Sequence, residues 1–448
     1  MNSSTPVTVA QHLSRVRNLV TATEPELLAI QDAPGRFLSR SIKAKAAIPA
    51  FNNSSMDGFV VHDADVAGAG PWTLPVVGEV AAGAKPQEFS PGGALRIMTG
   101  APISADPRRL RVIPTELTDA QVGPSQLPRS VTINSLPDKR HIRLRGEVVR
   151  PDDEILSAHT LVDAGCLAYL LNAGVMHIPV FRIPRIAVIS SGDELVSAEK
   201  TAAGFEDDAA GHNFRIADSN GPMITRLLEE HGPVIVERFH VGDGVSTLQE
   251  LLDELTTRSE NPVDLVVTTG GISQGAFDVV KAAVRQSPNA QLWFGKVAQR
   301  PGSPQGAGKW NDVAMVTLPG NPVAAYVSAL VYVIACLRIL QGRVAPARDS
   351  AAAAVSANSA WWPHRVLYAT PDPQLPNPRA SKTQLIPVRL DAANQPAGEN
   401  AAPALHAVPA QSGKLGSHFV NSLVGIEGLI VLDPAESDNT PSAVRVLR

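Results

Sequence analysis

Three loops of the sequence carry residues of the types that bind or transform a charged ligand. Each loop directly follows a segment that reads as a buried strand. The residues concerned are Asp193 and Glu194 in "SSGDELV", Gly270, Gly271, Ser273 and Asp278 in "GGISQGAFD", and Pro319, Gly320 and Asn321 in "LPGNPVAA". Glycines let a ligand approach backbone N–H groups, and the N-terminus of a following helix favours an anion. Together the loops predict a site for a phosphorylated or nucleotide-like ligand.

Each loop also has an ordinary structural explanation. A Gly-Gly pair after a strand can be only a tight turn, an Asp-Glu pair can cap a helix, and Pro322 can simply occupy the first position of a helix. The loops are more informative together, because all of them are expected at one edge of one sheet.

Two cations, Lys296 and Arg300, lie four residues apart in "FGKVAQRPGSP". Such a pair suits an oxyanion, although most such side chains are solvated surface groups. The sequence has no CxxC or HExxH motif, and its 11 histidines do not cluster at metal-ligand spacing, so we expect no structural zinc site. Carboxylates, glycines and cations in combination suit a hard divalent ion such as Mg²⁺, together with phosphate groups and an oxyanion.

A further carboxylate, Asp57, lies in "SSMDGFVV". Asp-Gly is typical of a turn, and Phe59 begins an apolar, strand-like run. The residues alone allow two interpretations. Asp57 forms the turn, or the turn holds its carboxylate over a cleft.

The elements that would position the three loops lie downstream of Arg185. Strand-like apolar runs alternate there with helical patterns of about 10 to 15 residues. In order, the segments are "RIAVIS" (strand), "NGPMITRLLEEHG" (helix), "VIVERFHV" (strand), "VSTLQELLDELTTR" (helix), "DLVVTTG" (strand), "FDVVKAAVRQS" (helix), "VAMVTLPG" (strand) and a long helix from Pro322. This alternation predicts a doubly wound, mostly parallel sheet, whose ligands bind beyond the carboxyl ends of the strands.

The remaining segments predict three further parts, and hence an α/β multidomain chain. Thr8 and Gln11 form a capping-box pattern that starts a helix running to about Val20, and a second short helix is expected from Pro25. The expected parts are an N-terminal helical linking domain (residues 1–47 with 142–180), a small β-rich domain (48–141), the α/β domain (181–341) and a C-terminal β domain (342–448).

Length and composition indicate a folded cytoplasmic protein. The 448 residues exceed one ordinary core, so several domains are expected. The formal net charge of −4 gives no sign of nucleic-acid binding. Cys166 and Cys336 lie far apart, which favours a reducing compartment without a disulfide framework. The N-terminus lacks a signal-peptide pattern, and polar residues interrupt the apolar run from Val323 to Leu340, so we expect a buried helix there and no membrane span.

A series of motifs, in this order along the chain, resembles the molybdopterin molybdenumtransferase family and the matching C-terminal domain of gephyrin. They are "NSSMDGFVV", "GEVAAGAKP", "RIMTGAP", "IRLRGEVV", "RIAVISSGDELV", "DSNGPMITRLLEEHG", "TTGGISQGAFDVVK", "TLPGNPVAAYV" and "EGLIVLDP". The resemblance implies a four-part subunit that dimerises and whose sheet domain binds adenylylated molybdopterin. With Mg²⁺ and molybdate, the family cleaves the adenylate and inserts molybdenum, so that AMP and molybdenum cofactor are the products.

The resemblance also implies roles for individual residues. Catalytic roles fall on Asp57, Thr99, Glu194, Asp243 and Asp278, of which Asp57, Asp243 and Asp278 would hold Mg²⁺ or orient water. Substrate contacts fall on Gly270, Gly271, Ser273, Lys296, Arg300, Pro319, Gly320 and Asn321, with Lys296 and Arg300 meeting molybdate or phosphate. Asp57 is thereby interpreted as an active-site acid that reaches the sheet-domain site of the other subunit.

The sequence departs from the family's motifs near the expected site. Leu110, Val148 and Ala276 stand where the family usually has acids, Ser303 stands in place of a lysine, and Ala324 in place of a serine. Two alternatives to an active transferase therefore stay open. One is a catalytically weakened family member that binds the pterin nucleotide or a protein partner as a scaffold, and the other is an unrelated nucleotide-binding transferase. A separate molybdopterin adenylyltransferase is a further possible partner, and tungstate is an alternative to molybdate.

Overall fold

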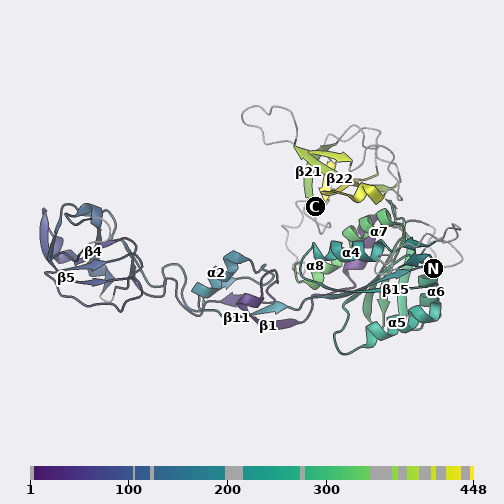
Figure 1. Cartoon of the computed structure of the whole chain (residues 1–448), viewed down its shortest axis with the longest axis horizontal. Helices are drawn as coiled ribbons and strands as arrows, with labels where there is room; N and C mark the ends of the chain where they lie inside the picture. Colours follow the sequence, from purple (N-terminus) through teal and green to yellow (C-terminus); the bar gives the residue numbers. More distant parts are fainter. Residues whose placement is uncertain are drawn as a thin grey trace, which may run out of the picture. The chain divides into compact units, whose positions relative to one another are not determined.

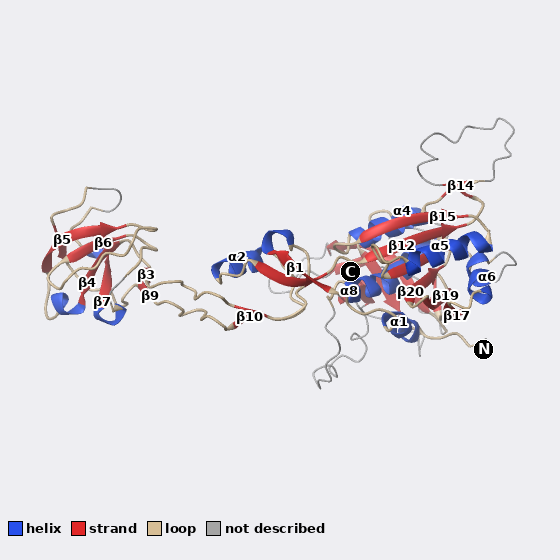
Figure 2. Cartoon of the chain, turned by 90° about the horizontal axis from the view of Figure 1, so that it is seen from below, coloured by secondary structure: helices blue, strands red, loops and turns tan. Residues whose placement is uncertain are grey.

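Two compact units make up the chain in the computed structural model. The first unit contains Met1–Glu26, Gly35–Phe37 and Phe181–Arg448, and the second contains Leu27–Pro34 and Leu38–Val180. The structure describes residues 5–103, 106–121, 126–196, 215–272, 278–343, 366–371, 381–392, 405–409, 420–434 and 444–447. Figures 1 and 2 show the helices and strands of both units.

The first unit is built on a six-stranded sheet. Its strands, in spatial order, are β15 (Ile235–Val241), β12 (Arg185–Ser191), β16 (Leu265–Thr269), β20 (Val313–Leu318), β19 (Pro304–Trp310) and β17 (Ala290–Lys296). The first four strands are parallel to one another, whereas β19 is antiparallel to both of its neighbours, β20 and the edge strand β17. The predicted mostly parallel sheet is confirmed, and two strands that were not predicted extend it.

Helices cover both faces of this sheet, as Figure 1 shows. On one face lie α4 (Asn220–Glu229), α7 (Pro322–Ser328) and α8 (Ile334–Leu340), and on the other lie α5 (Val245–Thr257) and α6 (Val279–Gln286). Alternate residues of β12 enter the two cores. Ile186 and Val188 pack in the core with α4 and α8, whereas Ala187 and Ile189 pack in the core with α5 and α6. Burial on both faces explains why the parallel strands read as continuous apolar runs.

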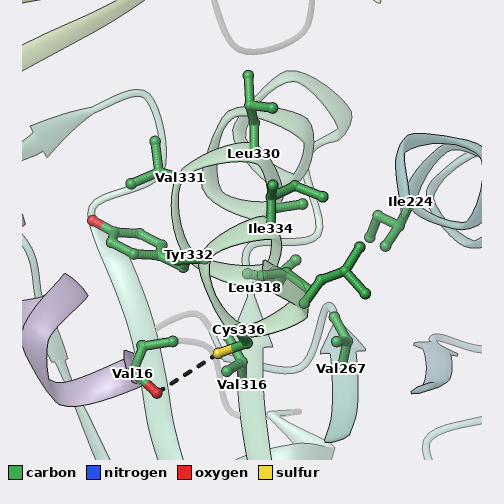
Figure 3. Packing of buried hydrophobic residues seen from close by; sticks show 14 of the residues in the cluster. Val16, Ile224, Val267, Val316, Leu318, Leu330, Val331, Tyr332, Ile334 and Cys336 are labelled. Atoms are coloured by element: carbon green, nitrogen blue, oxygen red, sulfur yellow. Dashed lines mark hydrogen bonds between the residues drawn. The ribbon is translucent and has the colours of Figure 1, made fainter. Parts of the chain in front are cut away.

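The longest apolar segment is a core helix of the first unit. α7, a π-helical stretch η5 (Ala329–Val333) and α8 follow one another over Pro322–Leu340, the one described segment with the length and composition of a membrane span. Within its most apolar window, 83% is buried inside the protein. Figure 3 shows this packing, in which the Cys336 thiol donates to the Val16 carbonyl at 3.6 Å. The prediction of a buried helix is confirmed.

The N-terminal helix α1 (Val9–Arg17) begins at the predicted capping box. The Thr8 hydroxyl accepts the Gln11 backbone N–H at 3.1 Å, and the Gln11 side-chain oxygen accepts the Thr8 backbone N–H at 2.9 Å. Buried residues of α1 share a hydrophobic cluster with α8. Residues 1–26 therefore belong to the first unit, which differs from the expected grouping of 1–47 with 142–180.

The helix expected from Pro25 is wrong. The segment Pro25–Ala29 forms strand β1, which pairs with β11 (His177–Phe181), and a 3₁₀ turn η1 (Ile30–Asp32) follows it. The segment is too short for helical propensity to outweigh the pairing with a strand that lies far away in sequence.

The second unit contains a five-stranded sheet and several short elements. The sheet has the order β7 (Leu110–Pro114), β4 (Gly58–His62), β6 (Ala94–Ile97), β5 (Trp72–Val80) and β8 (Ser130–Ile133). The other elements are β2 (Ile42–Lys43) paired with β10 (Glu154–Leu156), β3 (Asn53–Ser54) paired with β9 (Ile142–Arg143), helix α2 (Ala164–Asn172), and the 3₁₀ turns η2 (Asp63–Val66), η3 (Pro107–Arg109) and η4 (Thr115–Leu117). The expected linking region thus combines one helix with short strands.

A second six-stranded sheet occupies the C-terminal part of the first unit. Its strands, in spatial order, are β18 (Gln299–Arg300), β22 (Thr383–Ala392), β23 (Leu405–Pro409), β21 (Val366–Pro371), β25 (Val444–Leu447) and β24 (Gly428–Leu432), and a short turn η7 (Val420–Leu423) precedes β24. β22 also pairs with β24. The strands predicted in "TQLIPVRL", "EGLIVLDP" and "SAVRVLR" are present.

Candidate functional site

One cavity of about 580 Å³ lies beyond the carboxyl ends of the parallel strands. Segments that follow β12, β15, β16 and β20 form its walls, which is where open α/β sheets bind ligands. The predicted site residues that line it are Glu194, Asp243, Gly270, Gly271, Asp278, Pro319, Gly320 and Asn321. The three loops selected from the sequence therefore meet at one site.

The glycines of this site are required by backbone geometry. Gly270 and Gly271 have φ angles of +92° and +61°, which side chains rarely tolerate. A Cβ atom on Gly270 would lie 2.9 Å from the Ser191 carbonyl oxygen, and one on Gly320 would lie 3.3 Å from the Cα of Gly270. Gly270 thus lets its loop pass close to Ser191, and Gly320 lies close to Gly270 in the neighbouring loop. The Gly270 N–H is bonded to the Leu318 carbonyl, so it is not free for a ligand.

A group of carboxylates lines the same cavity. Glu194 follows β12 and Asp243 follows β15, and the Asp193 carboxylate accepts the Asp243 backbone N–H at 3.0 Å. Burial, together with the negative charges of Asp193 and Glu194, raises the pKa of the Asp243 carboxyl above its ordinary value. This wall therefore carries an excess of negative charge that a bound cation would relieve.

Asp278 lies on the cavity wall at the start of α6. Its carboxylate forms an ion pair with Lys281 at 3.1 Å, so a part of its charge is already neutralised. Within the described parts of the chain, no group of three or more His, Cys, Asp or Glu side chains is arranged to hold a metal ion by itself. Mg²⁺ is commonly held by one or two carboxylates plus phosphate oxygens of a substrate, and the donors present here fit that mode.

The two predicted cations are not among the residues that line the cavity. Lys296 ends β17 and Arg300 lies in β18, and both side chains are exposed to solvent. Pro304, four residues beyond Arg300, does line the cavity. The turn that carries the cations therefore borders the site, while the charged groups themselves point elsewhere in this structure.

Asp57 and Thr99, both in the second unit, contact each other directly. The Asp57 carboxylate accepts the Thr99 backbone N–H at 2.6 Å, and this bond lowers the pKa of the Asp57 carboxyl. The carboxylate is exposed, so it stays ionised and available to a ligand. Gly58, the first residue of β4, permits the close pairing with β7, because a Cβ atom there would lie 2.0 Å from the Ile113 carbonyl oxygen. Asp57 thus forms a turn and also presents a carboxylate.

The positions that depart from the family's motifs have different surroundings. Leu110 is buried in the core of the second unit, where a hydrophobic residue is stable, whereas Val148 is 68% exposed. The Ser303 hydroxyl donates to the Val297 carbonyl at 2.8 Å, and Ala324 is buried in α7. The predicted ligand residue Ser273 and the departure at Ala276 lie outside the described residues.

Sequence reasoning missed a set of polar residues at the bottom of the cavity. Ser191, Asp218, Asn220 and Thr269 all line it. The Asn220 side-chain amide donates to the Thr269 hydroxyl at 2.8 Å and to the Gly320 carbonyl at 2.7 Å. The signal in the sequence is "DSNG", which is part of a motif shared with the family and directly precedes the predicted helix, but was not predicted to lie at the site.

The fold and the cavity define a multidomain α/β protein with a cavity beyond the strand ends of its sheet domain. Two family models match this chain: the model "MoeA N-terminal region (domain I and II)" matches residues 7–174, and the model "Probable molybdopterin binding domain" matches residues 187–338. The chain is 32% identical to molybdopterin molybdenumtransferase 2 of Mycobacterium tuberculosis over 78% of this chain and 84% of that protein. This chain belongs to the molybdopterin molybdenumtransferase family.

Further similarities agree with this membership. The molybdopterin molybdenumtransferase of Bacillus subtilis is 31% identical over 74% of each chain. Among solved structures, the molybdopterin biosynthesis MoeA protein from Pyrococcus horikosii matches 99% of each chain with a TM-score of 0.72 at 21% identity, which shows a shared fold.

Proposed function

We propose that this chain inserts molybdate into adenylylated molybdopterin in a Mg²⁺-dependent reaction that releases AMP and molybdenum cofactor. Family membership supports the reaction, because the most similar relatives described above are molybdopterin molybdenumtransferases. The observation that carries the proposal is that the glycine loops 270–271 and 319–321 and four carboxylates (Glu194, Asp218, Asp243 and Asp278) converge on one cavity of a size suited to a nucleotide-like ligand.

The glycine loops are proposed to bind the phosphate part of the substrate. Gly270 and Gly271 line the cavity without side chains that would block a ligand, and the N-cap residue Ser219 and the first residue of α4, Asn220, line the same cavity. Glycine loops of this kind let an anion approach the backbone closely, whereas the first N–H groups of α4 are bonded to the Asp218 carboxylate. Pro319, Gly320 and Asn321 are proposed to form the opposite wall of the substrate site.

The carboxylates are proposed to hold Mg²⁺ together with the substrate. Bound there, Mg²⁺ would neutralise charge that develops on the phosphate oxygens as the anhydride bond is cleaved. Asp243 and Asp278 supply the hard oxygen donors, and Glu194 adds negative charge beside Asp243. Because the pKa of the Asp243 carboxyl is raised, protonation of this group competes with Mg²⁺ binding more than at an ordinary aspartate.

Asp57 and Thr99 are proposed to act at the sheet-domain site of the partner subunit in a homodimer. The exposed, ionised carboxylate of Asp57 supports this role, because hydrogen bonds from the backbone and side chain of Thr99 hold it in place. Lys296 and Arg300 are proposed to meet molybdate or phosphate once substrate is bound. Ser273 is proposed to take part in phosphate binding.

The experiment uses purified full-length protein, adenylylated molybdopterin and Mg²⁺, with and without molybdate, and follows AMP release. We expect molybdate-dependent release that is lost in Asp57→Ala and Asp278→Ala, with both variants folded by circular dichroism. Full activity in both variants would remove the assigned roles of these acids, and AMP release that ignores molybdate would contradict the proposed reaction.

A scaffold role is the second candidate, and the exposed side chain of Val148 favours it, because the family usually has an acid there. It predicts tight binding of adenylylated molybdopterin without AMP release. A separate molybdopterin adenylyltransferase would be a natural partner in either case, since it would supply the adenylylated substrate. We also propose a cytoplasmic location, consistent with the two free cysteines, Cys166 and Cys336.

A further inference from the structure

Asn220 joins three segments of the cavity that are distant in sequence. It is the first residue of α4 and is only 7% exposed. Its side-chain nitrogen donates to Thr269 Oγ1 at 2.8 Å, at the end of β16, and to the Gly320 carbonyl oxygen at 2.7 Å, after β20. One amide group is therefore bonded to both of the neighbouring strand-end loops.

The orientation of this amide follows from its partners. The Gly320 oxygen is a carbonyl and can only accept, so the atom that faces it must be the NH₂ group of Asn220. The other atom, Asn220 Oδ1, is buried and has no hydrogen-bond partner among the described residues. A buried acceptor without a partner is unfavourable, so the two hydrogen bonds that the NH₂ group donates must offset this cost.

Hydrogen bonds to the neighbouring residue Asp218 fix the backbone of Asn220. One oxygen of the Asp218 carboxylate accepts the backbone N–H groups of both Asn220 and Gly221, each at 3.1 Å. A Cβ atom on Gly221 would lie 2.8 Å from the second oxygen of that carboxylate, so glycine is needed there. The sequence "DSNG" thus sets the start of α4 at a fixed place on the cavity floor.

The two loops also contact each other. The Thr269 hydroxyl donates to the Pro319 carbonyl at 3.3 Å, and the Gly270 backbone N–H donates to the Leu318 carbonyl at 3.2 Å. Asn220, at the start of α4, adds one hydrogen bond to each of these loops. We propose that Asn220 is a positioning residue that fixes the spacing between the ligand loops 269–271 and 319–321, and that this spacing sets the affinity for the pterin nucleotide.

The identity of the ligand rests on the proposed function, whereas the role of Asn220 in loop spacing rests only on the hydrogen bonds. Loss of the NH₂ group leaves the Gly320 carbonyl and the Thr269 hydroxyl without their common donor, so only the direct contacts between the loops hold their spacing. We expect KM for adenylylated molybdopterin to rise roughly tenfold in Asn220→Ala, the effect of losing hydrogen bonds of ordinary strength. The value of kcat should change little, because Asp243 and Asp278 lie on other segments.

Asn220→Asp tests the role of the NH₂ group through the pH dependence of KM. If Asn220 only filled space, KM of this variant would not depend on the protonation of the new carboxyl group. An ionised carboxylate has the shape of the amide but no hydrogen to donate, whereas a protonated carboxyl can donate to the Gly320 carbonyl. We expect KM of N220D to be raised at pH 8 and to fall toward the wild-type value as the pH approaches 6. KM of N220A should show no such recovery.

The test combines these kinetics with amide hydrogen exchange of Gly270, Gly271 and Gly320 in the ligand-free full-length protein. We expect faster exchange in N220A, N220D and Thr269→Val, and effects of N220A and Thr269→Val on exchange that are less than additive. Thr268→Val is the matched control, because it removes a buried hydroxyl one residue away that has no hydrogen-bond partner in the described structure. It should leave exchange at the three glycines and KM unchanged.

The outcomes separate this proposal from the proposed function. Faster exchange in N220A and N220D without any turnover in the wild type would support the positioning role and refute the proposed reaction. Wild-type turnover with unchanged exchange and unchanged KM in both variants would overturn the positioning role. A loss of kcat at unchanged KM would also overturn it. If N220A does not fold, the isosteric N220D and Thr269→Val decide the question by the same measurements.

Discussion

His12 provides a sharp prediction about stability, because it is a histidine buried among aromatic rings. Its ring centre lies 5.2 Å from that of Trp293 and 4.6 Å from that of Tyr332, and neither ring nitrogen has a hydrogen-bond partner in the described structure. Arg15 lies 4.0 Å above the Trp293 ring. Burial, and to a lesser degree the positive charge of Arg15, lowers the pKa of His12 from 6.5 to about 3.

The sign of the pH dependence follows from this lowered pKa. In the unfolded chain His12 binds a proton as the pH falls through 6.5, whereas in the folded protein it stays neutral down to about pH 3. Its contribution to stability is therefore fully present above pH 6.5 and is lost progressively as the pH falls between 6.5 and 3. At pH 5 the difference of 1.5 pH units corresponds to about 2 kcal/mol, at about 1.36 kcal/mol per unit.

The assay compares urea unfolding of the wild type and His12→Phe at pH 7.5, 6 and 5. Phenylalanine keeps an aromatic ring in the site and removes the titratable group, so a constant packing difference cancels when only the pH dependence is compared. We expect the free energy of unfolding of the wild type to fall by about 2 kcal/mol more than that of the variant between pH 7.5 and pH 5. Parallel pH profiles for the two proteins would refute the reasoning.

Two further predictions concern the site and its support. Gly58→Ala should destabilise the second unit by roughly 1–3 kcal/mol, because its Cβ atom would lie 2.0 Å from the Ile113 carbonyl oxygen, and an unchanged urea midpoint would contradict this. Asp193→Asn should move the acidic limb of the pH–rate profile to lower pH. The Asp193 charge helps to raise the pKa of Asp243, while the asparagine oxygen can still accept the Asp243 backbone N–H. An acidic limb that does not move would show that Asp243 does not control the rate in that range.

The sequence was sufficient to predict the parts of the fold whose signal is local. The alternation of strands and helices after Arg185 predicted the parallel part of the sheet, and Thr8 with Gln11 predicted the start of α1. The antiparallel strand β19 was missed because Gly306 and Gly308 weaken its strand pattern. A Cβ atom on Gly306 would lie 2.3 Å from Thr317 Oγ1, so glycine is present for close packing between strands, which only the folded sheet reveals.

At the site, too, features set by the order of neighbouring strands could be predicted, whereas contacts between distant residues could not. Loops that follow adjacent parallel strands must meet at one edge, so the grouping of Glu194, Gly270 and Gly320 could be predicted. The bonds from Asn220 to two of those loops join residues 49 and 100 positions apart, and no local pattern encodes them. The orientation of Lys296 likewise depends on tertiary packing at the edge of the sheet.

If the cavity couples adenylate cleavage to molybdenum insertion, as we propose, the stoichiometry of the two products tests the coupling most directly. Full-length protein with limiting adenylylated molybdopterin, Mg²⁺ and excess molybdate would be sampled over time for AMP and for molybdenum cofactor. The account predicts that both products appear together in a ratio of one to one, and that neither accumulates without molybdate. AMP release at the same rate without molybdate, or binding without either product, would contradict it.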